Sequence, residues 1–261
     1  MFGQKHRLWQ KAAIVLAATA GVAALGSSSA SAQAVPFPGS QVPLSALLPG
    51  GADAGGIIIG DKVFTDFSYV GSPDASTSTN PAPSAGDISV APKPGLGPNS
   101  EGLTFSASWN STNGHNQDSI ISYAVHTLSG LPLIHSMGLD FNGAAMGSNA
   151  GAGVTESVYQ ATFNPSTGHY VQGTALNGSP ISVFNDGTGS PIDVSQTSLT
   201  FSSNQAAVFV RKDISDFSPT NGTGISSISQ VDNSFTKVPE PAALGLLALG
   251  TLGVLARRRK A

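Results

Sequence analysis

Serine, histidine and aspartate are the side chains of this chain that could together build a hydrolytic site. Such a site needs a serine nucleophile, a histidine base bonded to it, and a carboxylate that orients the base. The histidines beyond the N-terminal region fall in loops or on the outer faces of expected strands: His115, His126, His135 and His169. The Gly-x-Ser-x-Gly elbow that exposes a nucleophilic serine does not occur. We therefore expect no catalytic residue, and a secreted hydrolase stays an alternative without a nucleophile.

Clustered oxygen atoms form the best candidate for a metal site. Residues 185–189 (Asn-Asp-Gly-Thr-Gly) and the later Asp193 could offer oxygen ligands to Ca²⁺ from one turn. They lack the spacing of an EF-hand loop, and an Asp-Gly turn between two strands explains them as well. The histidines show no His-x-x-x-His spacing, and the absence of cysteine excludes thiolate sites for zinc or iron–sulfur clusters. We therefore expect no metal and no other cofactor.

Aromatic residues beside polar loops could bind carbohydrate. A sugar-binding site needs exposed rings that stack on the sugar, with hydrogen-bonding side chains close by. Trp109 and Tyr123 flank the polar segment 110–118, but the alternation of their strands points both rings toward the core. A carbohydrate-binding module for extracellular polysaccharide is therefore an alternative for which the sequence supplies no exposed site.

The last twenty-three residues have the organisation of a membrane-sorting signal. Pro239, Glu240 and Pro241 precede an uncharged hydrophobic segment, 242–256, and the run ends in four consecutive cations: Arg257, Arg258, Arg259 and Lys260. A fifteen-residue helix spans roughly 22 Å, less than the ~30 Å hydrocarbon core, so insertion needs snorkelling arginines and local bilayer thinning. The four cations would hold this end in the cytoplasm.

This three-part tail resembles the PEP-CTERM signal of exported proteins of Gram-negative bacteria. The resemblance implies that Pro239, Glu240 and Pro241 are recognised by a membrane protease of the exosortase type. The same tail has been called the C-terminal domain of ice-binding proteins, a label that implies no affinity for ice elsewhere in the chain. Residues 60–69 and 210–214 also resemble exported PEP-CTERM proteins. Together they imply a β-rich protein of bacteria that make extracellular polysaccharide and biofilm matrix.

The N-terminus predicts a secretory signal peptide over residues 1–34. Basic residues come first, an apolar segment follows at 12–25, and small residues then offer cleavage sites after Ala32 or Ala34. We expect this segment to form a signal helix, to engage the secretion translocon and to be removed by signal peptidase.

The part between the two signals is acidic. All fifteen Asp and Glu residues but only five Lys and Arg lie between residues 35 and 241, a formal charge of −10 against −3 for the whole chain. Nucleic acids and anionic lipids need basic patches, so we expect neither as a partner. The charge is typical of a soluble extracellular domain.

The sequence predicts one all-β domain over residues 35–237, with an antiparallel β-sandwich or jelly-roll-like fold. Short segments of period-two hydrophobicity recur from residue 57 to residue 235, and Asn-Gly or Asp-Gly dipeptides separate several of them. Residues 72–98 are rich in Pro, Ser, Thr and Gly and predict a low-complexity surface loop. The sorting signal, 238–261, would add a hydrophobic helix over 242–256.

Taken together, the sequence predicts an exported structural protein of the cell surface or extracellular matrix. The C-terminal segment would anchor it transiently in the inner membrane before an exosortase-type protease releases it. Extracellular polysaccharide is a candidate partner, and the carbohydrate-binding module and the secreted hydrolase are the alternatives.

Overall fold

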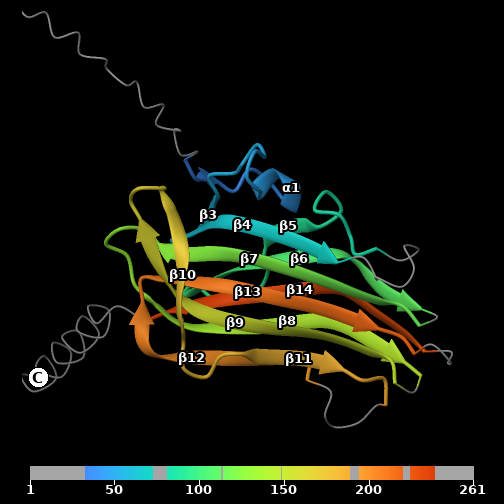
Figure 1. Ribbon diagram of the computed structural model, residues 1–261. Coiled ribbons are helices and arrows are strands. Elements are labelled where there is room, and N and C mark those ends of the chain that lie inside the picture. Colours follow the sequence, from blue (N-terminus) through green and yellow to red (C-terminus); the bar gives the residue numbers. More distant parts are fainter. Residues whose placement is uncertain are drawn as a thin grey trace, which may run out of the picture. The chain divides into compact units, whose positions relative to one another are not determined.

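Two β-sheets make up the folded domain (Figure 1). The computed structural model describes residues 33–72, 81–112, 114–147, 149–188, 194–219 and 224–238. The chain divides into two compact units, 1–30 and 31–261, and every described residue belongs to the second. In chain order the elements are β1 (Val35–Pro36), β2 (Val42–Pro43), α1 (Leu44–Leu47), β3 (Ile57–Ile59), β4 (Lys62–Ser72), β5 (Ser89–Pro92), β6 (Ser100–Thr112), β7 (Asn116–Thr127), β8 (Ile134–Met146), β9 (Gly151–Asn164), β10 (His169–Ala175), β11 (Ile181–Asn185), β12 (Gln196–Gln205), β13 (Ala207–Phe217) and β14 (Ile225–Lys237).

The strands are shared between sheet A, in the order β1-β3-β4-β7-β13-β9-β10, and sheet B, in the order β12-β8-β14-β6-β5-β2. Strand β11 also pairs with β9, so β10 and β11 follow one another along the same edge of that strand. The last two strands of the chain lie in the middle of their sheets. Strand β13 lies between β7 and β9, and β14 lies between β8 and β6. The predicted all-β sandwich is confirmed, and the strand order, which no local pattern specifies, comes from the structure.

Period-two alternation separates the inner from the outer side of each long strand. On β13 the inward residues Val208, Val210 and Ile214 are buried, whereas Phe209 and Arg211 on the outer side are partly exposed. This is the pattern expected of a sheet with one face on the core and one toward solvent.

Aromatic rings fill the middle of the core around Tyr123. Phe67 stacks on its ring at a centroid distance of 5.4 Å, and Phe105 lies 5.7 Å away. Trp109 is also buried, and its indole Nε1–H donates to Ser119 Oγ at 3.1 Å. The prediction that Trp109 and Tyr123 face the core is confirmed, so neither ring is available to stack on a sugar.

A charged pair lies among these apolar residues. Lys212 Nζ donates to Glu156 Oε2 at 2.9 Å, and both side chains are completely buried. Asn233 Nδ2 donates to both carboxylate oxygens of Glu156, at 3.0 and 2.9 Å, and Tyr123 OH donates to Asn233 Oδ1 at 2.7 Å. Burial lowers the pKa of Lys212, while the adjacent Glu156 carboxylate opposes that shift. The network joins β7, β9 and β13 of sheet A to β14 of sheet B.

The predicted surface loop over 72–98 needs a correction. Residues 89–92 form β5, which lies between β6 and β2 in sheet B, and Ile88 and Val90 are fully buried. Two alternating apolar residues are enough for a short strand when a long partner is present, although the surrounding Pro and Ser favour a loop. Residues 73–80 lie outside the described part.

Of the two expected signal segments, 1–34 and 238–261, the described residues include only Gln33, Ala34 and Val238. Within the described part of the chain, no helix is long and apolar enough to cross a membrane.

Candidate functional site

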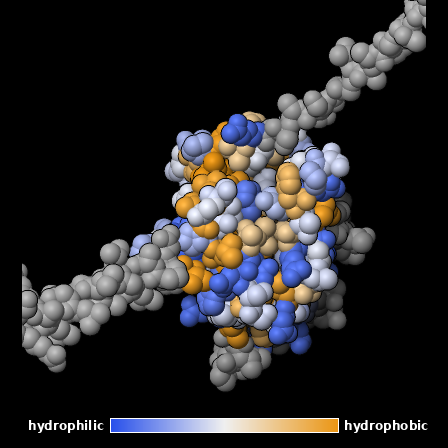
Figure 2. Space-filling view, turned by 90° about the vertical axis from the view of Figure 1, so that its left-hand side faces the viewer, coloured by the Kyte–Doolittle hydropathy of each residue, from blue (hydrophilic) through white to orange (hydrophobic). Residues whose placement is uncertain are grey.

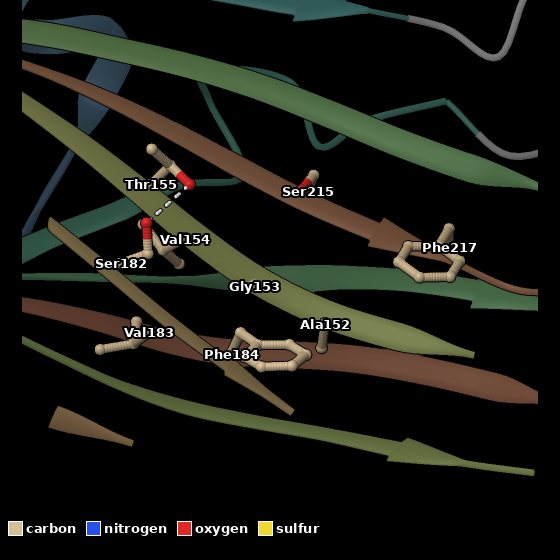
Figure 3. Close-up of a pocket in the computed structure, with 9 residues that line it drawn as sticks. All are labelled: Ala152, Gly153, Val154, Thr155, Ser182, Val183, Phe184, Ser215 and Phe217. Carbon is tan, nitrogen blue, oxygen red and sulfur yellow. Dashed lines mark hydrogen bonds between the residues drawn. The ribbon is translucent and has the colours of Figure 1, made fainter. Parts of the chain in front are cut away.

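Two exposed phenylalanines flank a groove on the outer side of sheet A (Figure 3). Phe184 of β11 and Phe217 of β13 stand on either side of Gly153 in β9, and their side chains are 38% and 50% exposed. The groove holds about 290 Å³, at the lower end of the roughly 300–1,000 Å³ usual for small-molecule sites. Large aromatic side chains are costly to leave in water, so a pair of them around a hollow suggests a binding surface.

The register of β11 and β13 against β9 determines which side chains line the groove. Phe184 and Ser215 both lie opposite Gly153, one on each neighbouring strand, and Phe217 lies opposite Gly151. A Cβ atom at Gly151 would come within 2.4 Å of the Phe217 ring, so the ring rests directly over the glycine. Glycine at this position therefore lets the Phe217 ring lie close to the sheet.

Hydroxyl groups line one end of the groove. Thr155 Oγ1 and Ser182 Oγ form a hydrogen bond of 3.1 Å across β9 and β11, and Ser215 lies on the β13 side. Asp213 lies opposite Thr155 in the sheet. Burial, together with a hydrogen bond to the nearby carboxyl of Asp118 and repulsion from it, raises the pKa of Asp213 to about 6.

This arrangement could accommodate the apolar face of a sugar ring, and its carboxyl pair lacks the spacing of a glycoside hydrolase. The two phenyl rings offer stacking surfaces, and the hydroxyl and carboxyl groups offer hydrogen bonds to sugar hydroxyls. A glycoside hydrolase needs two carboxyl groups about 5–9.5 Å apart, on opposite sides of the scissile bond. Asp118 and Asp213 are within hydrogen-bonding reach of each other, so they cannot flank a bond between them.

Side-chain oxygen atoms of the candidate calcium turn accept hydrogen bonds from other groups of the protein. Asn185 Oδ1 accepts from the backbone N–H groups of Ala145 and Gly187, at 3.2 and 2.9 Å. Asp186 Oδ1 accepts from the backbone N–H and the hydroxyl of Thr188, at 3.0 and 2.6 Å. These hydrogen bonds lower the pKa of Asp186. Asp193 lies outside the described residues, within which no three His, Asp or Glu side chains are grouped closely enough to hold a metal ion.

The structure brings two of the four histidines, His126 and His169, to the same place beside Asp66 and Tyr170, and it places His115 and His135 elsewhere. His135 Nδ1 contacts Asn204 Oδ1 at 3.0 Å on sheet B, and His115 lies before β7. His126 and His169 lie on the sheet A side, where His169 Nδ1 is 2.6 Å from Asp66 Oδ1. Among the signal residues, Ala34 is described, whereas Ala32, Pro239, Glu240, Pro241 and the four terminal cations lie outside the described part.

Phe184 and Phe217 were not predicted as site residues, although β13 carries a signal for Phe217. The three outward positions immediately before that residue are Arg211, Asp213 and Ser215, so an aromatic ring in the next position breaks a polar series. For Phe184 the alternation with buried Val183 gives the same hint, but only the pairing of β11 and β13 with β9 brings both rings to one groove.

A cluster of ion pairs binds the C-terminal end of β14, one residue before the last described residue. Lys237 Nζ lies 2.9 Å from Asp61 Oδ2 and 3.5 Å from Glu101 Oε1. The buried Lys62 contacts Asp61 and lies 3.4 Å from Glu101 Oε2. Burial raises the pKa of Asp61, but hydrogen bonds from Lys62 and Lys237 outweigh it and lower the value overall. Residues 60–69, which carried part of the resemblance, thus fasten the strand that leads into Pro239.

Residues 237–260 match the PEP-CTERM protein-sorting motif. The chain carries a PEP-CTERM sorting signal. The match begins at Lys237, the last residue of β14, so the PEP-CTERM signal follows the folded domain without a linker. A signal of this kind indicates, in general terms, export, transient anchoring in the membrane, processing by an exosortase and a place at the cell surface.

Solved structures similar to the domain that precedes the PEP-CTERM signal include several carbohydrate-binding modules. TmCBM61, in complex with β-1,4-galactotriose, has 10% sequence identity and a TM-score of 0.29, covering 65% of this chain and 88% of that chain. The CBM22-1 xylan-binding domain from Paenibacillus barcinonensis Xyn10C has 9% identity and a TM-score of 0.24, covering 59% and 85%. CBM28, specific for non-crystalline cellulose, has 11% identity and a TM-score of 0.25, covering 78% and 96%. TM-scores this low support no inference about the ligand. No curated protein matches the sequence.

Proposed function

We propose that this protein is a structural component of the cell surface or extracellular matrix, without a catalytic role. Signal peptidase removes the N-terminal segment after Ala32 or Ala34, and the C-terminal segment then anchors the chain in the inner membrane. An exosortase-type protease recognises Pro239-Glu240-Pro241, while the cations at 257–260 keep their end in the cytoplasm. The observation that carries this proposal is the PEP-CTERM match at residues 237–260, directly after β14.

The absence of catalysis is part of the proposal, and for glycoside hydrolysis on the grooved face it has a physical argument behind it. The most strongly paired carboxyl groups on the grooved face, Asp118 and Asp213, share hydrogen bonding with each other instead of facing each other across a gap. A pair in that geometry binds one proton between two oxygens and cannot attack and protonate from opposite sides.

Replacing Pro239, Glu240 and Pro241 together by alanine should leave the protein in the membrane fraction of its native organism. The protease would no longer recognise the tail, whereas the hydrophobic segment and the cations would still anchor it. Fractionation followed by immunoblotting measures this. A matched control replaces Ser227, on the exposed side of β14, by alanine and should leave the distribution unchanged. Release of the triple variant into the medium at the normal level would contradict the assigned role of the motif.

Carbohydrate binding is the second candidate function, and the groove between Phe184 and Phe217 favours it. Both rings are exposed on a solvent-facing sheet beside hydroxyl groups that can bond to a sugar, and Asp213 lies opposite Thr155 on the neighbouring strand. The candidate is compatible with the first, because a matrix protein needs a means of attachment to matrix polysaccharide.

Phe217→Ala should weaken binding to the organism's own extracellular polysaccharide by about tenfold or more, equivalent to ~1.4 kcal/mol for one buried aromatic contact. Affinity electrophoresis with that polysaccharide in the gel gives the dissociation constant. Leu131→Ala is the control, since Leu131 is also an exposed apolar side chain, 40% exposed, but lies in the β7–β8 loop. If the polysaccharide retards both variants and the unaltered protein equally, the groove is not the carbohydrate-binding site.

A further inference from the structure

A second aromatic hollow lies at the opposite end of β9 from the groove. The Tyr170 ring stacks on His126 at 4.8 Å between centroids, with 27° between the planes. Phe163 meets Tyr170 edge-on at 5.3 Å and is 49% exposed. These side chains, with Thr65 and Asp66, line a hollow of about 260 Å³. Figure 2 looks toward the end of the molecule that carries β10, where hydrophobic side chains lie exposed among hydrophilic ones.

The β9–β10 hairpin reaches this place by crossing the outer side of sheet A. Among the described strands β10 pairs only with β9 (Figure 1). The side chain of Tyr170 nevertheless contacts His126 of β7, and that of His169 contacts Asp66 of β4. Asp66 fixes the crossing, because its Oδ2 accepts from the backbone N–H of Tyr170 at 2.9 Å and its Oδ1 contacts His169. Asp66 itself has a left-handed φ of 56° at a β-bulge, which an aspartate tolerates better than most residues.

The hollow is therefore preorganised. It carries the Asp66 carboxyl group, and burial lowers the pKa of His126, which disfavours the charged form of that ring. The ring of Tyr170 is held from below by His126 and through its backbone by Asp66. A fixed aromatic ring loses little conformational entropy when a ligand stacks on it.

A row of partly exposed side chains joins the two hollows across β9 and β13. Its facing pairs are Phe209 with Tyr159, Arg211 with Ser157 and Asp213 with Thr155. From Thr155 beside the groove to Phe163 in the hollow, the strand advances by at most roughly 26 Å at ~3.3 Å per residue. Arg211 is offset by Asp213 two residues away, so the row has no strong charge of one sign.

We propose that the groove, the row and the second hollow form one track for a single extended polysaccharide chain, neutral or sparsely charged, lying along β9. The proposal rests on carbohydrate binding as the function of the groove and adds its second subsite and the polymeric nature of its ligand. A chain that reaches both aromatic hollows makes the second contact intramolecularly, which raises affinity without a new kind of interaction. A short oligosaccharide can occupy only one hollow at a time.

Signal-peptide cleavage decides what borders the second hollow. Gln33 and Ala34 line it together with Gly55 and Ile58. Cleavage after Ala34 would remove both residues and widen the hollow, whereas cleavage after Ala32 would keep them at its rim.

The test uses the mature protein secreted by its native organism and size-fractionated fragments of that organism's extracellular polysaccharide. Isothermal titration calorimetry should show that long fragments bind at least tenfold more tightly than the shortest fragments that bind at all. Tyr170→Ala should abolish this length gain while short fragments keep their affinity through the groove. Tyr170→Phe retains the stacking ring and should retain the gain, and Phe163→Ala serves as a second variant if Tyr170→Ala does not fold.

The outcomes separate the two proposals. Equal affinity of short and long fragments, or a length gain that survives both Tyr170→Ala and Phe163→Ala, would overturn the track but leave the groove as a single site. No binding of any fragment to the unaltered protein would overturn the carbohydrate-binding function itself, and the track with it.

Discussion

Replacing Lys212 by methionine should lower the free energy of unfolding by about 3–5 kcal/mol, a large share of the usual total of roughly 5–15 kcal/mol. The substitution leaves the Glu156 carboxylate fully buried with Asn233 as its remaining hydrogen-bond donor. An uncompensated charge in the core is far more costly than either a paired charge or none. Urea denaturation of the mature protein measures the loss, with the fluorescence of buried Trp109 as the probe.

The double variant Lys212→Met/Glu156→Gln should recover most of that loss. Neither charge remains, and the new amide oxygen can still accept from Asn233 Nδ2. Arg211→Met is the matched control, because Arg211 precedes Lys212 but lies on the partly exposed outer side of β13, where a substitution should cost less than about 1 kcal/mol. A single variant Lys212→Met as stable as the unaltered protein would contradict the buried pair.

Replacing Asp216 by asparagine should make the protein more stable at pH 8, by up to about 4 kcal/mol. Asp216 is buried at the end of β13, and burial raises its pKa to about 7, with a long hydrogen bond of 3.4 Å from Ser226 offsetting this only in part. An ionised carboxylate is therefore costly in the folded state and free of cost in the unfolded state, where aspartate titrates near ~3.9.

The direction in which stability changes with pH follows from the raised pKa of Asp216. Because the folded pKa is raised, the stabilisation from the neutral carboxyl is complete below about pH 4 and is lost as pH rises to about 7. The unaltered protein should lose stability over that range relative to Asp216→Asn, and the difference should level off above pH 7. Thermal unfolding at a series of pH values gives the two curves.

Asp186→Asn supplies the control for this series. Hydrogen bonds from Thr188 lower the pKa of that exposed carboxyl, so its removal should bring no gain in stability as pH rises. If Asp216→Asn and the unaltered protein keep a constant difference from pH 4 to pH 8, Asp216 is not a buried acid with a raised pKa.

Local patterns in the sequence predict the strands well and their partners hardly at all. The alternation around Tyr123 indicates both its strand and its inward side, because period two is a property of a few neighbouring residues. Lys212 sits in the same alternation as Val208 and Val210, so its burial could be inferred. Its partner Glu156, fifty-six residues earlier, cannot be inferred, because nothing local specifies that β13 lies beside β9.

The candidate site shows the same limit more strongly. Trp109 and Tyr123 are rightly excluded as exposed rings, but the rings that line the groove and the second hollow come from strands that meet only in the folded sheet. Tyr170 contacts β7 because its backbone N–H is bound by Asp66, which has a left-handed conformation at a bulge. Nothing in the sequence at 65–68 predicts that bulge. By contrast, the residues of the sorting signal are consecutive in the chain, so the signal can be recognised from the sequence directly.

The measurement that tests the account most directly is the intact mass of the protein recovered from the surface and medium of its native organism. We predict a chain that begins at residue 33 or 35 and ends near residues 239–241, alone or with heterogeneous glycan additions. That mass would establish the tail as a processed sorting signal. A mass that runs through Ala261, found in the membrane fraction, would show a permanent anchor and contradict processing by an exosortase-type protease.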